Sequence, residues 1–331
     1  MKSILGFGDI HFGDTSEWTL DVGENFLKWL REYDFGNKDD LEAVFVGDVN
    51  DRDTNAGSCI KQDTELADIL SEKFKHIYIL TGNHDKKLHK NVEQNSLDFL
   101  KTWKSISVIE KPELLTTENG FKCLLLPYMR TESQTLHDYY NDLPKELTSS
   151  EVDIIAGHWN KVKPGDIWMD DGVDINKLPK AKDYFIGHVH TRDDKDYTGS
   201  IWPNKVSEQE SNYKRAVKVL HDDSSKDEIS LPEFLHYDEI DYPNKISSPS
   251  DSAIHVYTVK KCNNLSLAKA FYKENYVRAI EKTDDMTTDI DLKSEDKTFL
   301  FKSNKEAFDS MIKDTDIKVS RQLYQYVSTL L

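Results

Sequence analysis

The stretch YILTGNHDKK, residues 78–87, begins as an apolar run and breaks abruptly into Gly82, Asn83, His84 and Asp85. Runs of Tyr, Ile and Leu favour a buried strand, whereas the Asn, His and Asp side chains that follow can bind protons or metal ions. One such strand end would carry little information. The chain repeats the pattern at four other places, so the group as a whole needs an explanation.

Each of the other four segments carries its polar side chains at the carboxyl end of an apolar run. Strands are expected at 3–9, 43–48, 153–158 and 184–189, and the polar groups at their ends are Asp9 with His11, Asp48 to Asp51, His158, and His188 with His190. In open α/β sheets, ligands gather outside the carboxyl ends of the strands. The sequence therefore predicts one pocket that holds a metal site.

The order of elements in the first two-thirds of the chain predicts an α/β fold. A further strand is expected at 122–128, and amphipathic helices are expected at 23–33, 63–74 and 96–103. Strands that alternate with helices favour right-handed crossover units and a parallel sheet.

The last third of the chain has a different texture. Residues 221–228 are polar and loop-like, and residues 242–252 are rich in Pro and Ser, which is typical of a linker. A strand at 253–259, a helix at 266–276 and a strand at 277–282 then predict a small α+β unit. We expect three parts, namely a catalytic domain at 1–235, a second domain at 236–300 and a helical segment at 301–331.

Composition limits the class of protein. The chain has 331 residues, of which 37% are hydrophobic and 31% charged, and no run approaches the length of a membrane span. Its three cysteines show no paired metal spacing, and Cys123 lies in an apolar run as a buried thiol would. These features predict a cytoplasmic protein with no membrane association.

The ordered set of motifs resembles the calcineurin-like metallophosphoesterase superfamily. The set comprises DIH at 9–11, GDVND at 47–51, GNHD at 82–85, GH at 157–158 and GHVH at 187–190. This resemblance implies a four-layer αββα sandwich of two sheets flanked by helices, with two divalent metal ions at one edge. It also implies a small α+β capping domain after the sandwich and helices at the C-terminus.

The resemblance assigns a role to each polar residue of the motifs. One metal ion would be held by Asp9, His11 and His190, the other by Asn83, His158 and His188, and Asp48 would bridge the two. Such a pair of ions polarises a phosphoryl oxygen and generates hydroxide between them. Mixed oxygen and nitrogen ligands suit manganese, iron or zinc better than magnesium, and the family's nucleases favour manganese.

Four more residues are candidates for catalysis or substrate binding. By resemblance, His84 protonates the leaving oxygen and Asp51 orients it through a hydrogen bond. Arg52 and Arg192 are candidates for contacts with a phosphate, the latter with a solvated loop charge as its alternative.

Three further features resemble the SbcD-type DNA repair exonucleases, which include the recombination endonuclease subunits of large phages. They are the segment CLLLPYMR at 123–130, the segment at 197–223 and the layout of the C-terminal third. The resemblance implies a DNA exonuclease or endonuclease in an SbcCD-like complex. Its partners would be DNA, a coiled-coil ABC-type ATPase like SbcC and a second copy of the chain, in the host cytoplasm if a phage encodes it.

Other interpretations stay open. The net charge of −17 has the wrong sign for a DNA-binding protein, unless bound cations and a basic partner compensate. The sequence GDVNDR at 47–52 resembles protein phosphatases, so a phosphomonoesterase is the alternative enzyme, and a scaffold without turnover is a third reading. The apolar stripe at 319–330 either docks on the ATPase or packs on the chain's own second domain.

Overall fold

The computed structural model of the chain describes residues 1–13, 18–51, 57–89, 92–129, 140, 143–162, 172–192, 194–209, 214–246, 251–262, 265–272 and 275–280. The chain divides into one compact unit at Met1–Lys282 and another at Thr283–Leu331. The predicted C-terminal helices fall in the second unit and lie outside the described residues. Arg52, in the first unit, also lies outside the described residues.

A six-stranded sheet forms the first layer of strands, in the order β14-β13-β1-β2-β3-β6. Its members are β1 Ser3–Phe7, β2 Leu41–Phe45, β3 His76–Leu80, β6 Ile106–Ile109, β13 Ala216–His221 and β14 Lys226–Ser230. The strands β1, β2, β3 and β6 run parallel, and the hairpin β13–β14 closes one edge antiparallel to β1. Of the loop expected at 221–228, residues 222–225 form the turn of this hairpin, which confirms it there, whereas residues 226–228 belong to β14 and were wrongly predicted.

A four-stranded sheet forms the second layer, in the order β12-β9-β8-β7. Its members are β7 Glu113–Thr116, β8 Lys122–Leu126, β9 Val152–His158 and β12 Ala181–Gly187. The strands β8, β9 and β12 run parallel, while β7 is antiparallel to β8. The parallel strands of each sheet thus end at a common edge, which is the arrangement that a shared pocket requires.

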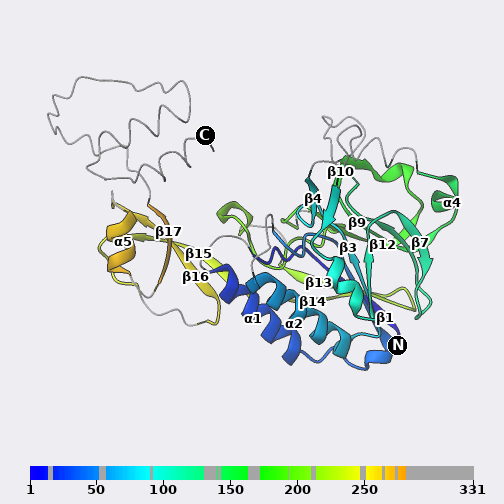
Figure 1. Cartoon of the computed structure of the whole chain (residues 1–331), viewed down its shortest axis with the longest axis horizontal. Coiled ribbons are helices and arrows are strands. Elements are labelled where there is room, and N and C mark those ends of the chain that lie inside the picture. The colour runs from blue at the N-terminus through cyan, green and yellow to red at the C-terminus, as the bar shows by residue number, and fades with distance from the viewer. Residues whose placement is uncertain are drawn as a thin grey trace, which may run out of the picture. The chain divides into compact units, whose positions relative to one another are not determined.

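The two sheets pack face to face through an apolar core, so the predicted α/β sandwich is confirmed (Figure 1). On β2, Val44 faces this inner core, whereas Ala43 and Phe45 belong to the core on the outer face of the sheet. The same alternation holds on β1, where Ile4 points inward and Leu5 outward. Both faces of the parallel strands are buried, which explains why these runs are almost continuously apolar.

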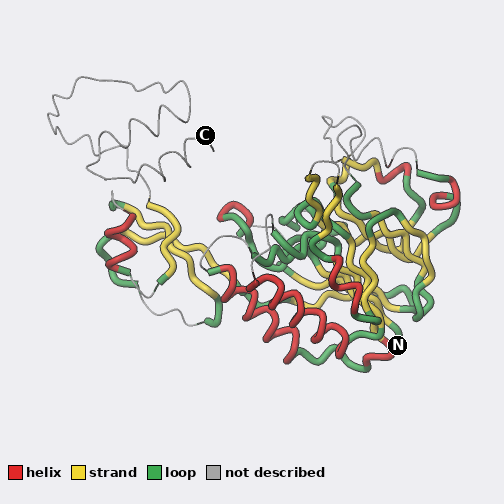
Figure 2. Tube along the Cα trace, in the orientation of Figure 1, coloured by secondary structure: helices red, strands yellow, loops and turns green. Residues whose placement is uncertain are grey.

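Two helices cover the outer face of the six-stranded sheet, α1 Thr19–Glu32 and α2 Gly57–Lys73 (Figure 1). Phe26 and Leu30 of α1 and Leu66 and Leu70 of α2 lie in the core they share with this sheet. On the outer face of the four-stranded sheet, the described residues include one short α-helix, α4 Lys145–Thr148, together with loops, a short strand that carries Val173 and a 3₁₀ helix that carries Ile175 (Figure 2).

The predicted α-helix at 96–103 is a short 3₁₀ helix instead, η2 Asp98–Thr102. The other 3₁₀ helices of the described chain are η1 Lys38–Asp40, η3 Ile175–Lys177 and η4 Val206–Glu208. Two short ribbons, β4 Lys86–His89 with β5 Val92–Asn95 and β10 Asn160–Val162 with β11 Gly172–Asp174, complete the sandwich part.

A three-stranded parallel sheet follows the sandwich, made of β15 Leu235–Asp241, β16 Ile254–Lys260 and β17 Tyr276–Ile280, with helix α5 Leu265–Phe271. The expected strand, helix and strand are present, while β15 was not predicted. Val259, Ala268 and Val277 form a core of their own. Tyr276 Oη donates a hydrogen bond to Asp21 of α1, which ties this sheet to the sandwich.

No helix in the described part of the chain is long and apolar enough to span a membrane.

Candidate metal centre

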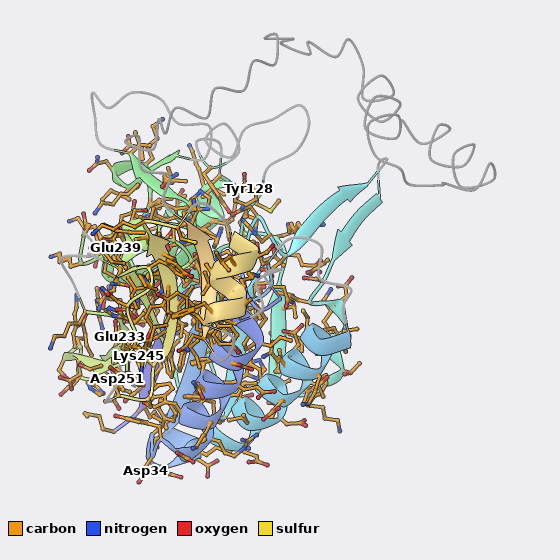
Figure 3. All side chains as sticks on the ribbon, turned by 90° about the vertical axis from the view of Figure 1, so that its left-hand side faces the viewer. Asp34, Tyr128, Glu233, Glu239, Lys245 and Asp251 are labelled. Carbon is orange, nitrogen blue, oxygen red and sulfur yellow. The ribbon has the colours of Figure 1, made fainter. Side chains whose placement is uncertain are left out.

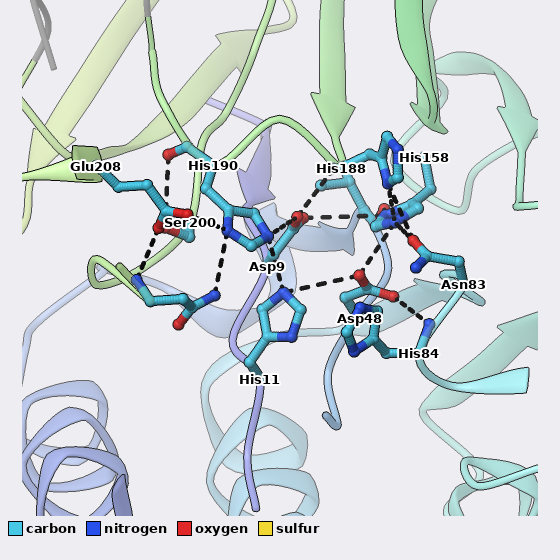
Figure 4. A network of polar contacts seen from close by, with 12 residues as sticks. Asp9, His11, Asp48, Asn83, His84, His158, His188, His190, Ser200 and Glu208 are labelled. Carbon is cyan, nitrogen blue, oxygen red and sulfur yellow. Dashed lines mark hydrogen bonds and ion pairs between the residues drawn. The ribbon is translucent and has the colours of Figure 1, made fainter. Parts of the chain in front are cut away.

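Five strands deliver polar side chains to one edge of the sandwich (Figure 4). Asp9 and His11 follow β1, Asp48 follows β2, Asn83 and His84 follow β3, His158 ends β9, and His188 and His190 follow β12. All of these positions are carboxyl ends of parallel strands. The structure therefore brings together every residue that the motifs proposed as a metal ligand.

The first group of ligand atoms belongs to Asp9, His11 and His190, whose nitrogen and oxygen atoms lie within 4.8 Å of one another. The Nε2 atoms of His11 and His190 are 3.0 Å apart, and His190 Nε2 lies 3.6 Å from Asp9 Oδ2. Atoms that converge in this way can bind one cation, because each offers a lone pair to a common point.

The second group consists of Asp48, His158 and His188, and Asn83 joins it. His158 Nε2 lies 3.2 Å from Asp48 Oδ2 and 2.9 Å from Asn83 Oδ1. His188 Nδ1 lies 3.0 Å from the same Asn83 oxygen. An amide oxygen, a carboxylate and two imidazoles thus face each other here.

Asp48 lies between the two groups. Its Oδ2 atom is 3.2 Å from His158 Nε2 and 3.7 Å from His11 Nε2, so one carboxylate oxygen reaches both sets of ligands. Its Oδ1 atom accepts a hydrogen bond of 2.8 Å from the backbone amide of His84. This position suits a carboxylate that holds two cations together against their mutual repulsion.

Three of these residues have backbone conformations that side chains normally avoid. His11, Asp48 and His188 have φ angles of 60°, 49° and 77°. Each such residue costs on the order of 1–3 kcal/mol, and this strain persists only where the surrounding structure imposes it. Its concentration at three proposed ligands indicates that the site's geometry is enforced at the expense of stability.

The electrostatics of the site fit bound cations. Burial and the nearby Asp48 raise the pKa of Asp9 well above its usual range, and the buried Asp9 Oδ1 has no hydrogen-bond partner among the described residues. Burial lowers the pKa of His158 and of His190, which keeps both imidazoles neutral as metal ligands must be. Burial also raises the pKa of Asp48, but the three histidines around it, His158, His11 and His84, more than offset this when they carry a positive charge and so hold it low in the absence of a cation. A cation would stabilise both carboxylates as anions.

A family profile described as calcineurin-like phosphoesterase matches residues 2–192, more than half of the chain. The chain belongs to the calcineurin-like phosphoesterase family. Membership implies metal-dependent hydrolysis of a phosphoester, and the two groups of ligands described above would hold the divalent ions. No curated protein sequence matches the chain.

The site of this phosphoesterase also contains the proposed proton donor. His84 Nδ1 forms a short hydrogen bond with Asp51 Oδ1, while the backbone amide of His84 is held by Asp48. The His84 side chain is 20% exposed, so it is accessible from the outside. The structure thus places Asp51 where it can orient His84 and stabilise its protonated form.

Arg192 does not lie in a solvated loop. The residue is only 1% exposed, and its guanidinium group forms an ion pair with Glu228. Its Nη1 atom also donates to the backbone carbonyl of Lys214 at 2.8 Å. These partners occupy the guanidinium group, so the structure does not support Arg192 as a phosphate ligand or as a solvated charge.

Two acidic residues of the site were not predicted from the motifs. Asp85 is buried and accepts hydrogen bonds from the amides of Asn50 and Gly82, at 3.0 and 2.9 Å, which fixes the loops after β2 and β3. Glu208 lies 3.1 Å from His190 Nδ1. Asp85 belongs to the GNHD motif, so a role in the site could have been predicted for it. Glu208 lies outside the motifs, and nothing in the sequence around it indicates a contact with His190.

Proposed function

We propose that the chain is a two-metal DNA nuclease, an exonuclease or endonuclease subunit of an SbcCD-like repair complex. The arrangement of Asp9, His11, Asp48, Asn83 and the three late histidines carries the phosphoesterase part of this proposal. The choice of DNA rests on the resemblance of segments 123–130 and 197–223 to the SbcD-type branch.

Divalent ions held by these ligands would supply positive charge to the phosphoryl oxygens and activate a water molecule. The mixed oxygen and nitrogen ligands suit manganese, iron or zinc better than magnesium, and we propose manganese because the nucleases that the chain resembles favour it. The chain's own residues position the substrate and move the proton. His84 donates a proton to the leaving oxygen, and Asp51 holds the imidazole through Nδ1, which leaves Nε2 to carry that proton. Asp48 fixes the backbone of His84 relative to the ligands.

The acidic chain needs positive charge from elsewhere to approach DNA. We propose that the metal ions supply part of it and that a coiled-coil ATPase of the SbcC type supplies the rest. The 331 residues contain no P-loop sequence, so ATP hydrolysis would have to come from that partner. A chain truncated after residue 300 should keep manganese-dependent cleavage of duplex DNA and lose binding to the ATPase; unchanged binding would contradict docking through 319–330.

The substrate is tested by comparing three phosphoesters with the purified chain and manganese. We expect cleavage of an end-labelled DNA duplex and of bis-p-nitrophenyl phosphate, with little turnover of p-nitrophenyl phosphate, because a nuclease acts on diesters. Turnover of the monoester alone would refute the nuclease proposal and support the phosphomonoesterase instead.

The role of His84 is tested by His84→Ala. Loss of a general acid should reduce cleavage by about 100-fold or more, while two manganese ions per chain remain bound. His76→Ala is the matched control, because His76 lies at the opposite end of the same strand, where it contacts Ser107. Loss of metal from His84→Ala would mean that His84 is a ligand and not a proton donor.

A further inference from the structure

Glu208 is an acidic side chain on η4 whose two carboxylate oxygens have different tasks. Oε1 lies 3.1 Å from His190 Nδ1 (Figure 4), and Oε2 accepts hydrogen bonds from the backbone amides of Asn204 and Lys205 at 2.7 and 3.3 Å. The residue is 8% exposed. A carboxylate that is this buried and holds two amides cannot turn away from the histidine without leaving both amides unpaired.

The backbone reinforces the same contact. Arg215 Nη2 donates to the carbonyl oxygen of Glu208 at 2.9 Å, and Arg215 Nη1 donates to the carbonyl oxygens of His190 and Ser200 at 3.2 and 3.1 Å. The amide of Ser200 also donates to the carbonyl of His190 at 3.0 Å. One guanidinium group therefore joins the segment that carries Glu208 to the segment that carries His190.

This contact decides which nitrogen of His190 carries the proton. A carboxylate can only accept, so a contact with Glu208 requires His190 Nδ1 to donate and leaves Nε2 with a lone pair. The amide nitrogen of Asn204, a donor, lies 3.3 Å from the same Nδ1 atom, but the carboxylate is nearer and carries a charge, so its contact dominates. Nε2 is the atom that points at His11 Nε2, 3.0 Å away, and at Asp9 Oδ2, 3.6 Å away. The lone pair of His190 is thereby directed into the first group of ligand atoms.

We propose that Glu208 is a positioning residue for the metal ion of the group Asp9, His11 and His190, because it fixes the tautomer of His190 and increases its basicity. Carboxylates that accept from a ligating histidine do both, and their loss costs about 10- to 100-fold in metal affinity. The proposal concerns metal binding alone, so it stands whether or not DNA is the substrate.

The second group of ligands has a weaker partner in the same position. His158 Nδ1 donates to the backbone carbonyl of Val46 at 2.9 Å, and a neutral carbonyl fixes the tautomer without adding charge. In the first group, Asp51 Oδ1 lies 3.7 Å from His11 Nδ1, too far for a hydrogen bond, but its negative charge is a second one near this group. The removal of Glu208 should therefore weaken one ion and not the other.

The test measures manganese binding to the metal-free full chain by calorimetry and by electron paramagnetic resonance. Glu208→Ala should bind one ion with unchanged affinity and the other about 10- to 100-fold more weakly, with loss of the signal of the coupled ion pair at limiting manganese. Glu208→Gln removes the charge and one acceptor, because its single oxygen can accept from His190 Nδ1 or from the two backbone amides but not from both, so it should also bind the affected ion more weakly.

A matched control is available at Glu233. This side chain is 53% exposed (Figure 3) and also contacts a histidine, since its Oε1 lies 2.7 Å from His236 Nδ1, but that histidine is not a site residue. Glu233→Ala should bind both ions as the unchanged chain does. Wild-type affinity for both ions in Glu208→Gln and Glu208→Ala, or equal weakening of both ions, would overturn the proposal. If Glu208→Ala does not fold, Glu208→Gln with wild-type affinity would overturn it by itself.

Discussion

Gly82 lies so close to Asp48 that a methyl group there should displace the carboxylate that we propose as the bridge between the two ions. A Cβ atom built on Gly82 would meet the carboxyl carbon of Asp48 at 2.7 Å, and its amide nitrogen and Oδ1 closer still. Ordinary contacts begin at 3.4 Å, so the carboxyl carbon would have to move by about 0.7 Å. Ligand distances in metal sites hold to within about 0.2 Å. Gly82→Ala should therefore disrupt metal binding although no ligand is changed.

The expected effect on stability can be separated from the effect on metal. Overpacking of this kind costs about 1–3 kcal/mol of unfolding free energy. Gly36→Ala is the control, because Gly36 has a φ of 102° and a Cβ there would meet nothing within 4 Å. An alanine in a left-handed backbone conformation costs about 1–2 kcal/mol of unfolding free energy. Gly36 lies before β2, at the end of the strand away from the site. The two variants should lose similar stability, and only Gly82→Ala should lose metal.

The assay combines urea unfolding of the metal-free variants with manganese titration. We expect Gly82→Ala to bind at least one of the two ions at least about tenfold more weakly. Loss of a residue that only hydrogen-bonds to a metal ligand already lowers metal affinity by about this factor. If Gly82→Ala bound two ions with wild-type affinity, the reasoning from the close approach of Gly82 to Asp48 would be refuted.

Two further predictions concern charged residues that do not ligate the metal ions. Burial raises the pKa of Asp63 to about 7, opposed by its bond to Asn50, so the folded chain keeps a proton that the unfolded chain releases near pH 4. The contribution of Asp63 to stability is thus greatest below pH 4 and falls as the pH rises to 7. Between pH 5 and pH 8, Asp63→Asn should reduce this fall by about 3 kcal/mol, measured by urea unfolding; an unchanged pH profile would contradict it. Arg192→Lys should lower the unfolding free energy by about 1–3 kcal/mol and leave KM unchanged. A raised KM would indicate instead that Arg192 contacts the substrate.

The strand ends could be predicted because local sequence and sheet geometry agree there. An apolar run that breaks into His or Asp fixes where a strand stops, and parallel strands place those stops at one edge. The runs before Asp9, Asp48 and Asn83 are buried on both faces, so they read clearly as strands. The ligand groups then required no knowledge of the turns between strands.

Other parts of the fold leave weaker traces in the sequence. Along β15, Leu235 and Tyr237 are buried while the residues after Tyr237 are at least partly exposed, so its apolar pattern is too short to predict a strand. The segment at 96–103 contains Leu97 and Leu100, and a spacing of three residues fits a 3₁₀ turn as well as an α-helix. The secondary structure of such segments is decided by their contacts with other parts of the fold, which cannot be predicted from the local sequence.

Glu208 shows why a metal site cannot be fully derived from motifs. Ligands are confined to strand ends because the backbone must turn sharply beside the ions, and this leaves recognisable Gly, Asp and His patterns. A residue that contacts a ligand from outside needs only a side chain of the right length, so it can come from any neighbouring loop. Here that segment is held in place by Arg215, whose bonds run to three backbone carbonyls and to the Ser200 hydroxyl, so most of them impose no residue type on their partners. The outer contacts of the site are thus specified by the folded chain, and the motifs specify only the inner ones.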